Sequence, residues 1–370
     1  GVARKGLIEL CAQYGRDEVV RYSDGLMDYA DHRATEEFRR IPDGVFEGLT
    51  WTDTDGNGAV DIPIKVTITK NGADIHVHYD GGPPSTGSFN ATYAVMMATS
   101  TIPFLYYIDS DIPHNHGVLQ HITADAVEGT ICMAKWPAAV GGATTNPADP
   151  MHEVINIAMA EAIPERVPAG SCHAGHMPNF NGIDKRNDKE WGCMLFNGMG
   201  GSGAAKDADG WPMIGTIAGM GGLTSASVEE VELLYPLHID FNEIETDSMG
   251  MGQWIGGAGL RTRFRPIAGH MEAVSFGEGS KNPPHGVNGG TRSAGGGIYV
   301  EHEDGARTFT SVAGQTLVRE GESWTGYSSG GGGWGNPVDR DAELVRRNLR
   351  DGGISEESAR AIFGVVLNDD

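Results

Sequence analysis

The sequence is poor in cysteine, in basic residues and in long apolar runs. Its 370 residues include four cysteines and no C-x-x-C pair, which argues against a disulfide framework and favours a reducing cytoplasm. Lys and Arg number 27 against 50 Asp and Glu, and this net charge of −23 argues against binding to nucleic acid or to an anionic membrane. No apolar run reaches the roughly 18 residues of a spanning helix, and no signal peptide is visible. We therefore expect a cytoplasmic protein.

Glycine is the residue in excess. The chain has 55 glycines, roughly double the ordinary share, without the Gly-X-Y period of collagen. The glycines cluster between apolar segments, and 39% of the residues are apolar, which is enough for a core. We predict an α+β fold with β-rich mixed layers, a few docking helices, Gly-rich loops and a small C-terminal helical segment.

The order of these segments suggests four regions. We expect a helical hairpin over residues 1–43, a central α+β region with the ligand pocket over 44–265, a β-rich region over 266–336, and C-terminal helices over 337–370. The spacing of apolar residues predicts helices over 4–14, 17–40 and 91–107, and strands over 44–52, 62–69, 74–79, 125–133 and 191–196, the last of them buried.

The stretch from 130 to 182 is where we expect the ligand site. An extended apolar run over 130–133 leads into a loop, and a helix then begins with Asp149 as N-cap and Pro150 in the first position, until Pro164 stops the apolar period. A second loop, rich in Gly and Asn, follows the helix. Two polar loops around a buried helix are typical of a small-molecule site.

Two other loops have more than one interpretation. The run D-T-D-G-N-G-A-V-D over 53–61 matches the early positions of an EF-hand calcium loop. Ile64 stands where that loop needs a bidentate Glu, so a hairpin turn is favoured. The Gly-rich loop that begins at residue 197 lacks the Gly-Lys-Ser/Thr end of a phosphate-binding loop. Both a loop whose amides approach a ligand and a set of tight β-turns stay open for it.

A series of motifs runs in order along the whole chain. They are E-L-C-A-Q-Y-G, D-G-L-M-D-Y-A-D-H-R, R-I-P-D-G-V-F-E-G, D-I-P-H-N-H-G, P-A-A-V-G-G-A-T-T, I-P-E-R-V-P-A-G, G-G-S-G-A, E-V-E-L-L-Y-P-L, G-G-A-G-L-R, G-G-G-G-W-G-N-P and D-G-G-I-S-E-E-S-A-R-A-I-F-G-V-V-L. Each motif is weak alone. Together, in this order, they resemble the C-terminal two-thirds of a subunit of the hydantoinase B/oxoprolinase family.

The resemblance implies one subunit of an ATP-dependent, multi-subunit enzyme. In this family a partner, the hydantoinase A-type ATPase subunit, binds ATP with Mg²⁺ and phosphorylates a carbonyl oxygen of the substrate. The subunit resembled here then processes the activated small molecule. We expect hydrolytic opening of a cyclic amide, such as a hydantoin, 5-oxoproline or a lactam. Two alternatives are ATP-dependent carboxylation of a ketone, as in acetone and acetophenone carboxylases, and a non-catalytic scaffold subunit of the same complex.

The family also implies a region that precedes this sequence. Its members carry a further N-terminal region, with a metal-binding His/Asp motif, before the point that corresponds to Gly1. We expect that region to be cleaved, to be a separate chain, or to lie outside a fragment. The ligands of a Zn, Mn or Fe ion are accordingly expected mainly outside this chain.

Activation of an amide or a ketone requires hydrogen-bond donors for an oxyanion. The G-G-A-T-T run and an amide side chain of the second loop offer such groups, so the predicted substrate-binding residues are Gly141, Gly142, Thr144, Thr145 and Asn179. A packed turn is the alternative for the G-G-A-T-T run.

The same chemistry requires a general base, and histidine is the commonest one. His114 and His116, with Asn115 between them, are the predicted catalytic residues, although at most one of the two rings points into a given pocket. His173 and His176 are candidate metal ligands if a third ligand converges on them. Histidines that only hydrogen-bond within a loop are the alternative.

Overall fold

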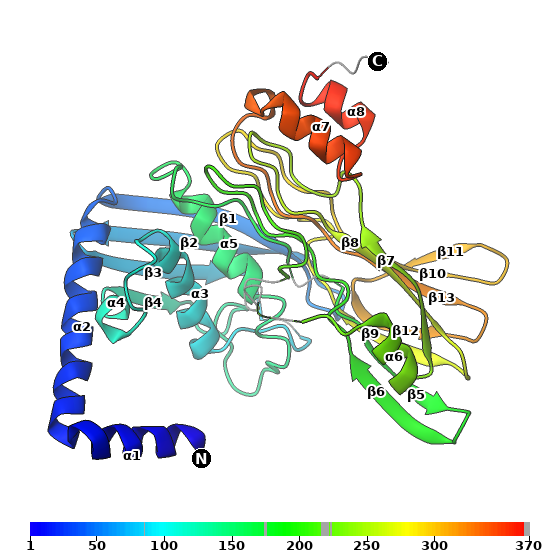
Figure 1. Cartoon of the computed structure of the whole chain (residues 1–370), viewed down its shortest axis with the longest axis horizontal. Coiled ribbons are helices and arrows are strands. Elements are labelled where there is room, and N and C mark those ends of the chain that lie inside the picture. The colour runs from blue at the N-terminus through cyan, green and yellow to red at the C-terminus, as the bar shows by residue number, and fades with distance from the viewer. Residues whose placement is uncertain (85, 174–175, 216–221, 223, 366–370) are drawn as a thin grey trace.

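The computed structural model describes residues 1–84, 86–173, 176–215, 222 and 224–365. Within these ranges the chain has three β-sheets and several helices, which confirms the predicted α+β fold (Figure 1). One sheet and the helices up to α5 form an N-terminal part, and the other two sheets form a second part. No helix in the described ranges is long and apolar enough to cross a membrane.

The N-terminal part is built on a sheet of order β1-β2-β3-β4, in which β4 pairs parallel to β3 and the other pairs are antiparallel. Alternate residues of β2, from Ile62 to Ile68, are buried, and α5 packs on β1 and β2. The elements are α1 (Val2–Tyr14), α2 (Arg16–Arg39), β1 (Gly44–Thr54), β2 (Val60–Asn71), β3 (Asp74–Gly81), α3 (Tyr93–Tyr106), α4 (His116–Leu119), β4 (Ile122–Ala126) and α5 (Ala148–Met159).

The second part consists of two sheets that share one core. Their orders are β11-β10-β13-β8-β7 and β12-β9-β5-β6. Phe180 of one sheet meets Phe264 and Trp324 of the other, with ring centroids 4.9 and 5.4 Å from its own. The elements are β5 (Asn179–Asp184), β6 (Lys189–Met194), α6 (Val228–Leu234), β7 (Leu237–Ile244), β8 (Leu260–Pro266), β9 (Met271–Phe276), β10 (Gly297–Glu301), β11 (Arg307–Thr310), β12 (Ala313–Val318) and β13 (Ser323–Tyr327).

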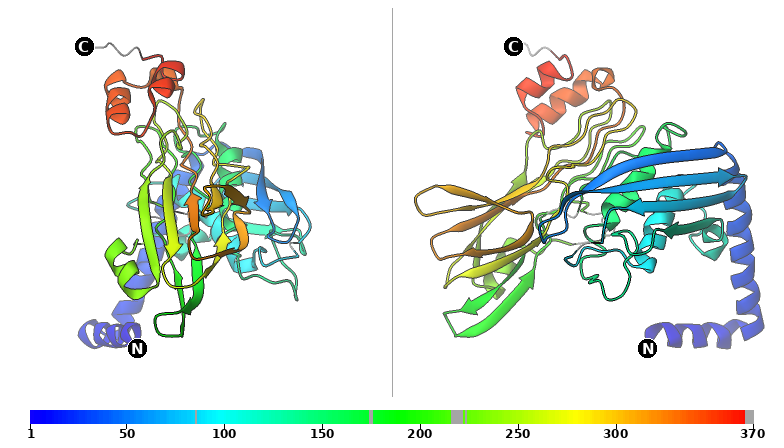
Figure 2. Two further views of the ribbon diagram at one scale, coloured as in Figure 1. Left: turned by 90° about the vertical axis from the view of Figure 1, so that its right-hand side faces the viewer. Right: turned by 180° about the vertical axis from the view of Figure 1, so that it is seen from behind.

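A bundle of glycine-rich extended segments runs from these sheets toward the C-terminal helices (Figure 2). Backbone hydrogen bonds join the segments laterally: Gly331 N donates to Gly257 O at 2.9 Å, and Gly257 N donates to Ser202 O at 2.8 Å. A Cβ atom at Gly331 would lie 1.9 Å from the Ser202 carbonyl oxygen. Glycine is therefore required because neighbouring backbones are in contact. Part of the loop that begins at residue 197 belongs to this bundle. The sequence suggested either a loop whose amides approach a ligand or a set of tight β-turns, and neither interpretation included this lateral packing.

The small C-terminal helical segment is confirmed and is anchored by one arginine. It comprises the 3₁₀ turn Pro337–Asp339, α7 (Ala342–Arg350) and α8 (Glu356–Ala361). The buried Arg340 guanidinium lies 2.7 Å from Asp209 and also bonds the Gln253 carbonyl oxygen at 2.9 Å. This bidentate type of contact ties the helices to the glycine-rich bundle. The division into four regions stays a prediction.

Three predictions of local structure were wrong. The strand expected over 125–133 ends at Ala126, because residues 130–133 close a tight turn instead of an extended run. Pro147 rather than Asp149 is the N-cap of α5, and the helix ends at Met159, before Pro164. The strand expected to be buried over 191–196 is β6, which lies at a sheet edge and alternates between half-buried and exposed residues.

The hairpin interpretation of residues 53–61 is confirmed. β1 and β2 pair up to Thr54 and Val60, and the turn is organised by Asp55, whose Oδ1 accepts hydrogen bonds from Asn57 N and Ala59 N at 2.8 and 3.0 Å. The carboxylate therefore stabilises its own turn, as Asp side chains commonly do.

Candidate active site

Helix α5 carries a stripe of polar residues through the protein interior. Asp149, His152, Glu153 and Asn156 recur at helical spacing, and each is at most 6% exposed. Buried polar groups require partners, and buried charges are rare unless they are paired. The stripe therefore marks the face of α5 that meets polar side chains from other segments.

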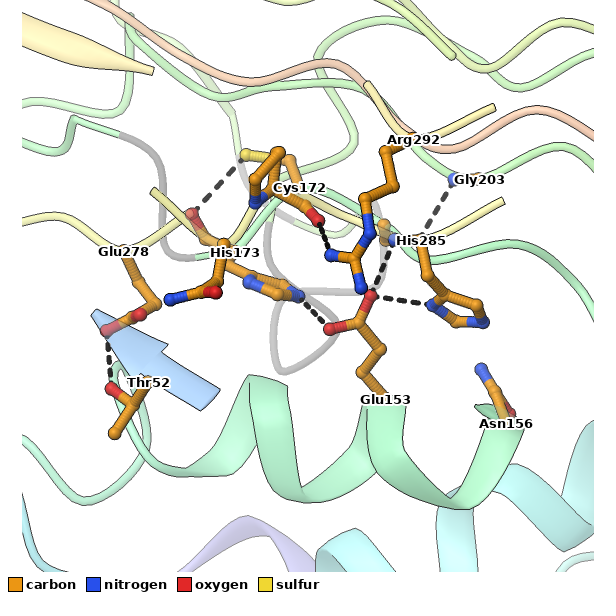
Figure 3. Close-up of polar contacts among 12 residues, drawn as sticks. Thr52, Glu153, Asn156, Cys172, His173, Gly203, Glu278, His285 and Arg292 are labelled. Atoms are coloured by element: carbon orange, nitrogen blue, oxygen red, sulfur yellow. Dashed lines mark hydrogen bonds and ion pairs between the residues drawn. The ribbon is translucent and has the colours of Figure 1, made fainter. Parts of the chain in front are cut away.

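Glu153 holds two histidines that come from different loops (Figure 3). Its Oε1 lies 2.6 Å from His285 Nδ1 and accepts a 2.7 Å hydrogen bond from His285 N. Its Oε2 lies 2.8 Å from His173 Nε2, an ion-pair contact outside hydrogen-bond geometry. His173 Nδ1 and His285 Nε2 are buried without a hydrogen-bond partner among the described residues. A carboxylate that fixes an imidazole and leaves its other nitrogen unbound is an arrangement found in enzyme active sites.

A second buried carboxyl group, Glu278, lies on the opposite side of His173 from Glu153 (Figure 3). Thr52 Oγ1 at the end of β1 donates to Glu278 Oε2 at 2.7 Å, and Asp53 N donates to Glu278 Oε1. Glu278 is 3% exposed. His173 is therefore flanked by two carboxyl groups that are both removed from solvent.

The end of β1 also fixes the loop that follows Glu278. The Asp53 carboxylate accepts hydrogen bonds from Ser280 N at 2.6 Å, Lys281 N at 3.0 Å and Asn282 N at 2.8 Å. Hydrogen bonds to an ionised carboxylate are stronger than neutral ones. The N-terminal part thus positions a loop of the second part.

The two carboxyl groups are held in opposite protonation states. Burial acts to raise the pKa of Glu153, but the two imidazoles lower this pKa well below its usual value. Burial acts to lower the pKa of His173, but Glu153 raises it to about 9. Burial and the charge of Asp53 raise the pKa of Glu278 to about 8. At neutral pH an ion pair of Glu153 and His173 therefore faces a Glu278 carboxyl group that is mostly protonated.

The free energy of unfolding is expected to fall as the pH rises from 6.5 to 9. The raised pKa of His173 gives a stabilisation that is complete below 6.5 and is lost as the pH rises through about 9. Folding also favours the protonated form of Glu278, so the free energy of unfolding falls as the pH rises from 4.5 to 8. Each group contributes a limiting slope of about 1.4 kcal/mol per pH unit. Denaturant unfolding of the wild type and Glu278→Gln measures this: the variant should show the shallower slope below pH 8, and equal slopes would contradict the assignment.

Two residues of the polar stripe, His152 and Asn156, belong to a separate hydrogen-bond network. Tyr106 Oη contacts His152 Nε2, and Tyr107 Oη donates to Asn156 Oδ1 at 2.5 Å. Burial lowers the pKa of His152 to about 3, so this ring is neutral. These contacts are consistent with a structural role for His152.

Glu153, His173, Glu278 and His285 form a buried cluster, and two cavities of about 10 Å³ adjoin it. One is lined in part by Asp149, Glu153 and His173, and the other in part by His176 and Glu278. A cavity of this volume holds about one water molecule. A larger molecule reaches these side chains only if the segments around them move.

The predicted catalytic residues lie elsewhere. His114 and His116 are exposed, and Asn115 caps α4, with its Oδ1 accepting from Gly117 N at 2.8 Å and its Nδ2 donating to Leu26 O. This turn packs on α2, away from the side chains of Figure 3. A catalytic role for the three residues stays a prediction that the geometry does not support.

The predicted substrate loop lies nearer to the cluster. Gly142 packs on Phe89, where a Cβ atom would lie 2.4 Å from the ring, and Gly141 borders Ser88. Asn146 Nδ2 donates to Gly277 O at 3.2 Å, next to Glu278.

The other predicted binding residues differ in exposure. Thr144 is exposed, whereas the Thr145 hydroxyl donates to Gly142 O within the loop. Asn179 begins β5 and keeps a buried Nδ2 without a partner among the described residues. Substrate binding by the five residues stays a prediction.

The predicted metal ligands have different surroundings. His173 contacts Glu153, whereas His176 packs on Trp324 with ring centroids 5.7 Å apart. In the described ranges no three His, Cys, Asp or Glu side chains are arranged to hold a metal ion.

The residues around His173, namely Glu153, Glu278 and His285, are not among the residues predicted from the sequence. For Glu153 and Asn156 a signal was present, because polar residues at i, i+3, i+4 and i+7 of an apolar helix indicate a polar face inside the core. Glu278 and His285 lie in Gly- and Pro-rich segments without periodicity. No sequence pattern marks them.

Fold and site define a class of protein with a buried carboxylate–imidazole cluster between two parts that each contain β-sheet. The chain matches the family Hydantoinase B/oxoprolinase over residues 1–337, and it belongs to that family. It is 31% identical over 375 residues to the caprolactamase subunit beta of Pseudomonas jessenii, covering 99% of this chain and 64% of that protein. It is 24% identical over 404 residues to the acetophenone carboxylase delta subunit of Aromatoleum aromaticum, covering 98% and 58%.

A solved structure has the same fold. The crystal structure of the ATP-dependent caprolactamase from Pseudomonas jessenii matches with a TM-score of 0.89 and 27% identity, covering 100% of this chain and 65% of that one. The chain thus spans less than two-thirds of the length of these relatives. The resemblance to the family found in the motifs is confirmed.

Proposed function

We propose that this chain is the catalytic-type subunit of a cytoplasmic, ATP-dependent enzyme that hydrolyses a cyclic amide. An ATPase partner of the hydantoinase A type would bind ATP and Mg²⁺ and phosphorylate the carbonyl oxygen. The observation that carries the proposal is His173, a buried imidazole flanked by Glu153 and Glu278 in opposite protonation states. Pairs of titratable groups whose pKa values are driven apart are typical of acid–base sites.

Each residue has a separate role in the proposed reaction. Ionised Glu278 takes a proton from a water molecule as the water oxygen bonds to the phosphorylated carbonyl carbon, and it gives that proton to the ring nitrogen as the C=N bond becomes single. It then passes the proton of the new hydroxyl group to the same nitrogen as the C–N bond breaks, which leaves a ring-opened acyl phosphate. A second water molecule releases inorganic phosphate from that acyl phosphate and leaves the free acid. The His173 imidazolium stabilises the negative charge that develops on the oxygen that comes from this first water molecule. Glu153 is a positioning residue, because it keeps His173 charged and oriented, and His285 positions the Glu153 carboxylate.

A bell-shaped pH dependence of kcat follows from these roles. Activity should rise with pH until Glu278 is ionised near 8 and fall when His173 loses its proton near 9. The rate of ring opening by the assembled enzyme, measured from pH 6 to 10, tests this. Glu153→Gln should move the alkaline limb to lower pH, because it removes the charge that raises the pKa of His173. A profile without limbs in this range would contradict the assignment.

The compounds that stimulate ATP consumption by the complex distinguish the hydrolase from the carboxylase. We expect the purified complex to consume ATP with a lactam or a hydantoin in the absence of bicarbonate and to release the ring-opened product. The higher identity to the caprolactamase subunit, 31% against 24% for the acetophenone carboxylase subunit, supports hydrolysis. ATP consumption that requires bicarbonate and a ketone would establish the carboxylase alternative instead. Unchanged turnover of cluster variants in an intact complex would favour a scaffold subunit.

A further inference from the structure

An open groove of about 440 Å³ lies beside the segment that carries Glu278. Its lining includes Asp55, Thr86, Ser88, Phe89, Phe276 and Gln315. Phe276 precedes the Gly277–Glu278 pair at the end of β9, and Asp55 follows Asp53 at the end of β1. The two segments that hold Glu278 therefore also form walls of the groove. Its volume is within the range of small-molecule sites.

The groove combines an apolar floor with uncharged polar groups. The rings of Phe89 and Phe276 meet edge to face, with centroids 6.4 Å apart. The Ser88 hydroxyl can donate to a carbonyl oxygen or accept from an N–H group. The Thr86 hydroxyl donates to Asp55 Oδ2 at 3.2 Å and can accept, and the Gln315 amide, which donates one N–H to Glu272 Oε2 at 2.9 Å, keeps its second N–H and its oxygen. The groove residues, all within the described ranges, include no Lys, Arg or His.

Among the described residues of the groove lining, the charged side chain is that of Asp55, which is negative. Asp55 is 1% exposed, and its carboxylate accepts hydrogen bonds from Asn57 N, Ala59 N and Thr86. Burial acts to raise the pKa of Asp55, but these hydrogen bonds lower it overall, so the group is ionised at neutral pH. A second carboxylate in the groove would meet repulsion and no compensating cation.

We propose that this groove binds the ring of an uncharged cyclic amide and discriminates against rings that carry a carboxylate. The inference rests on the proposed function and specifies its substrate class. Ring methylenes would pack on Phe89 and Phe276, and the amide would bond to the hydroxyl and amide side chains. The loop with Gly141 and Gly142 supports this wall, because Gly142 packs on Phe89 and Gly141 borders Ser88.

Two ligands that differ only in a carboxylate test the proposal. These are the unsubstituted five-membered lactam and 5-oxoproline, titrated into the assembled enzyme without ATP and followed by ligand-observed NMR. We expect 5-oxoproline to bind roughly tenfold more weakly or worse, the effect of one uncompensated like charge. Because binding is measured without turnover, a failure of the proposed hydrolysis would not produce this result or hide it. Equal affinities, or no binding of the lactam, would overturn the proposal.

A matched pair of variants on β12 tests whether the ring binds in this groove. Gln315 is exposed and lines the groove, whereas Leu317, 43% exposed on the same strand, does not. Both lysines are introduced together with Glu272→Gln, because Glu272 Oε2 lies 2.9 Å from Gln315 Nε2 and would pair with the new cation. In that background Gln315→Lys should raise the affinity for 5-oxoproline roughly tenfold by supplying the missing cation. Leu317→Lys adds the same charge outside the groove and should leave both affinities unchanged. If both variants or neither changed the preference, the ring would not bind in this groove.

Discussion

Replacing Glu278 by Gln in the assembled enzyme is expected to lower kcat by a factor of roughly 10² to 10⁴, the usual contribution of a proton-transferring side chain. Glutamine has the size of the glutamate and can still accept a hydrogen bond from Asp53 N or Thr52 Oγ1, but it cannot take a proton from water. KM should change much less than kcat, because the loss affects the transition state. Steady-state release of the ring-opened product measures both constants.

The control for this variant is Glu229→Gln, a change of the same kind at an exposed position in the first turn of α6. It should leave kcat unchanged. Sedimentation or size-exclusion analysis should show the same complex for both variants. A Glu278→Gln enzyme with wild-type kcat in an intact complex would remove Glu278 from the reaction.

Replacing Gly331 by Ala is expected to destabilise the fold by about 3 kcal/mol or more, at the upper end of the cost of overpacking. The new Cβ atom would lie 1.9 Å from the Ser202 carbonyl oxygen and 2.2 Å from its carbon. Backbone atoms in a hydrogen-bonded bundle cannot rotate away as a flexible side chain can. Thermal unfolding followed by circular dichroism should show a clear drop in Tm or a loss of soluble protein.

Gly25→Ala is the matched control for this effect. Gly25 lies within helix α2, and a Cβ atom there would have no neighbour within 4 Å. Alanine is a better helix former than glycine by about 1 kcal/mol, so this variant should be as stable as the wild type or slightly more stable. If the two variants had the same Tm, close backbone contact would not explain the glycine content.

The helices and strands that could be predicted from the sequence are those whose apolar residues recur with a regular period. Alternation of apolar residues located β2, and helical spacing located α2, because one face of each packs on a core. The glycine-rich bundle has no side-chain period, since its segments pack through backbone atoms. Its glycines were therefore assigned to loops or turns. The error at β6 has a related cause, because a sequence does not show which strand will lie at a sheet edge.

The candidate site could be predicted only in part. His173 was selected as a candidate ligand, and it lies at the centre of the cluster. Its partners Glu153, Glu278 and His285 come from α5, the end of β9 and a Pro-rich segment, which only tertiary folding brings together. His114 and His116 lie closer together in the sequence than His173 and its partners do, and were therefore easier to select. Asn115 between them caps helix α4, which gives this motif a structural role.

A single-turnover experiment tests most directly whether this subunit performs the hydrolysis. The assembled Glu278→Gln enzyme is mixed with a cyclic amide and ATP, quenched at short times, and assayed for ADP and for the ring-opened product. We expect ADP to form as rapidly as in the wild type, because phosphorylation belongs to the partner, while ring opening is slowed by roughly 10² or more. Ring opening at the wild-type rate would contradict the proposal and assign the hydrolytic step to another chain.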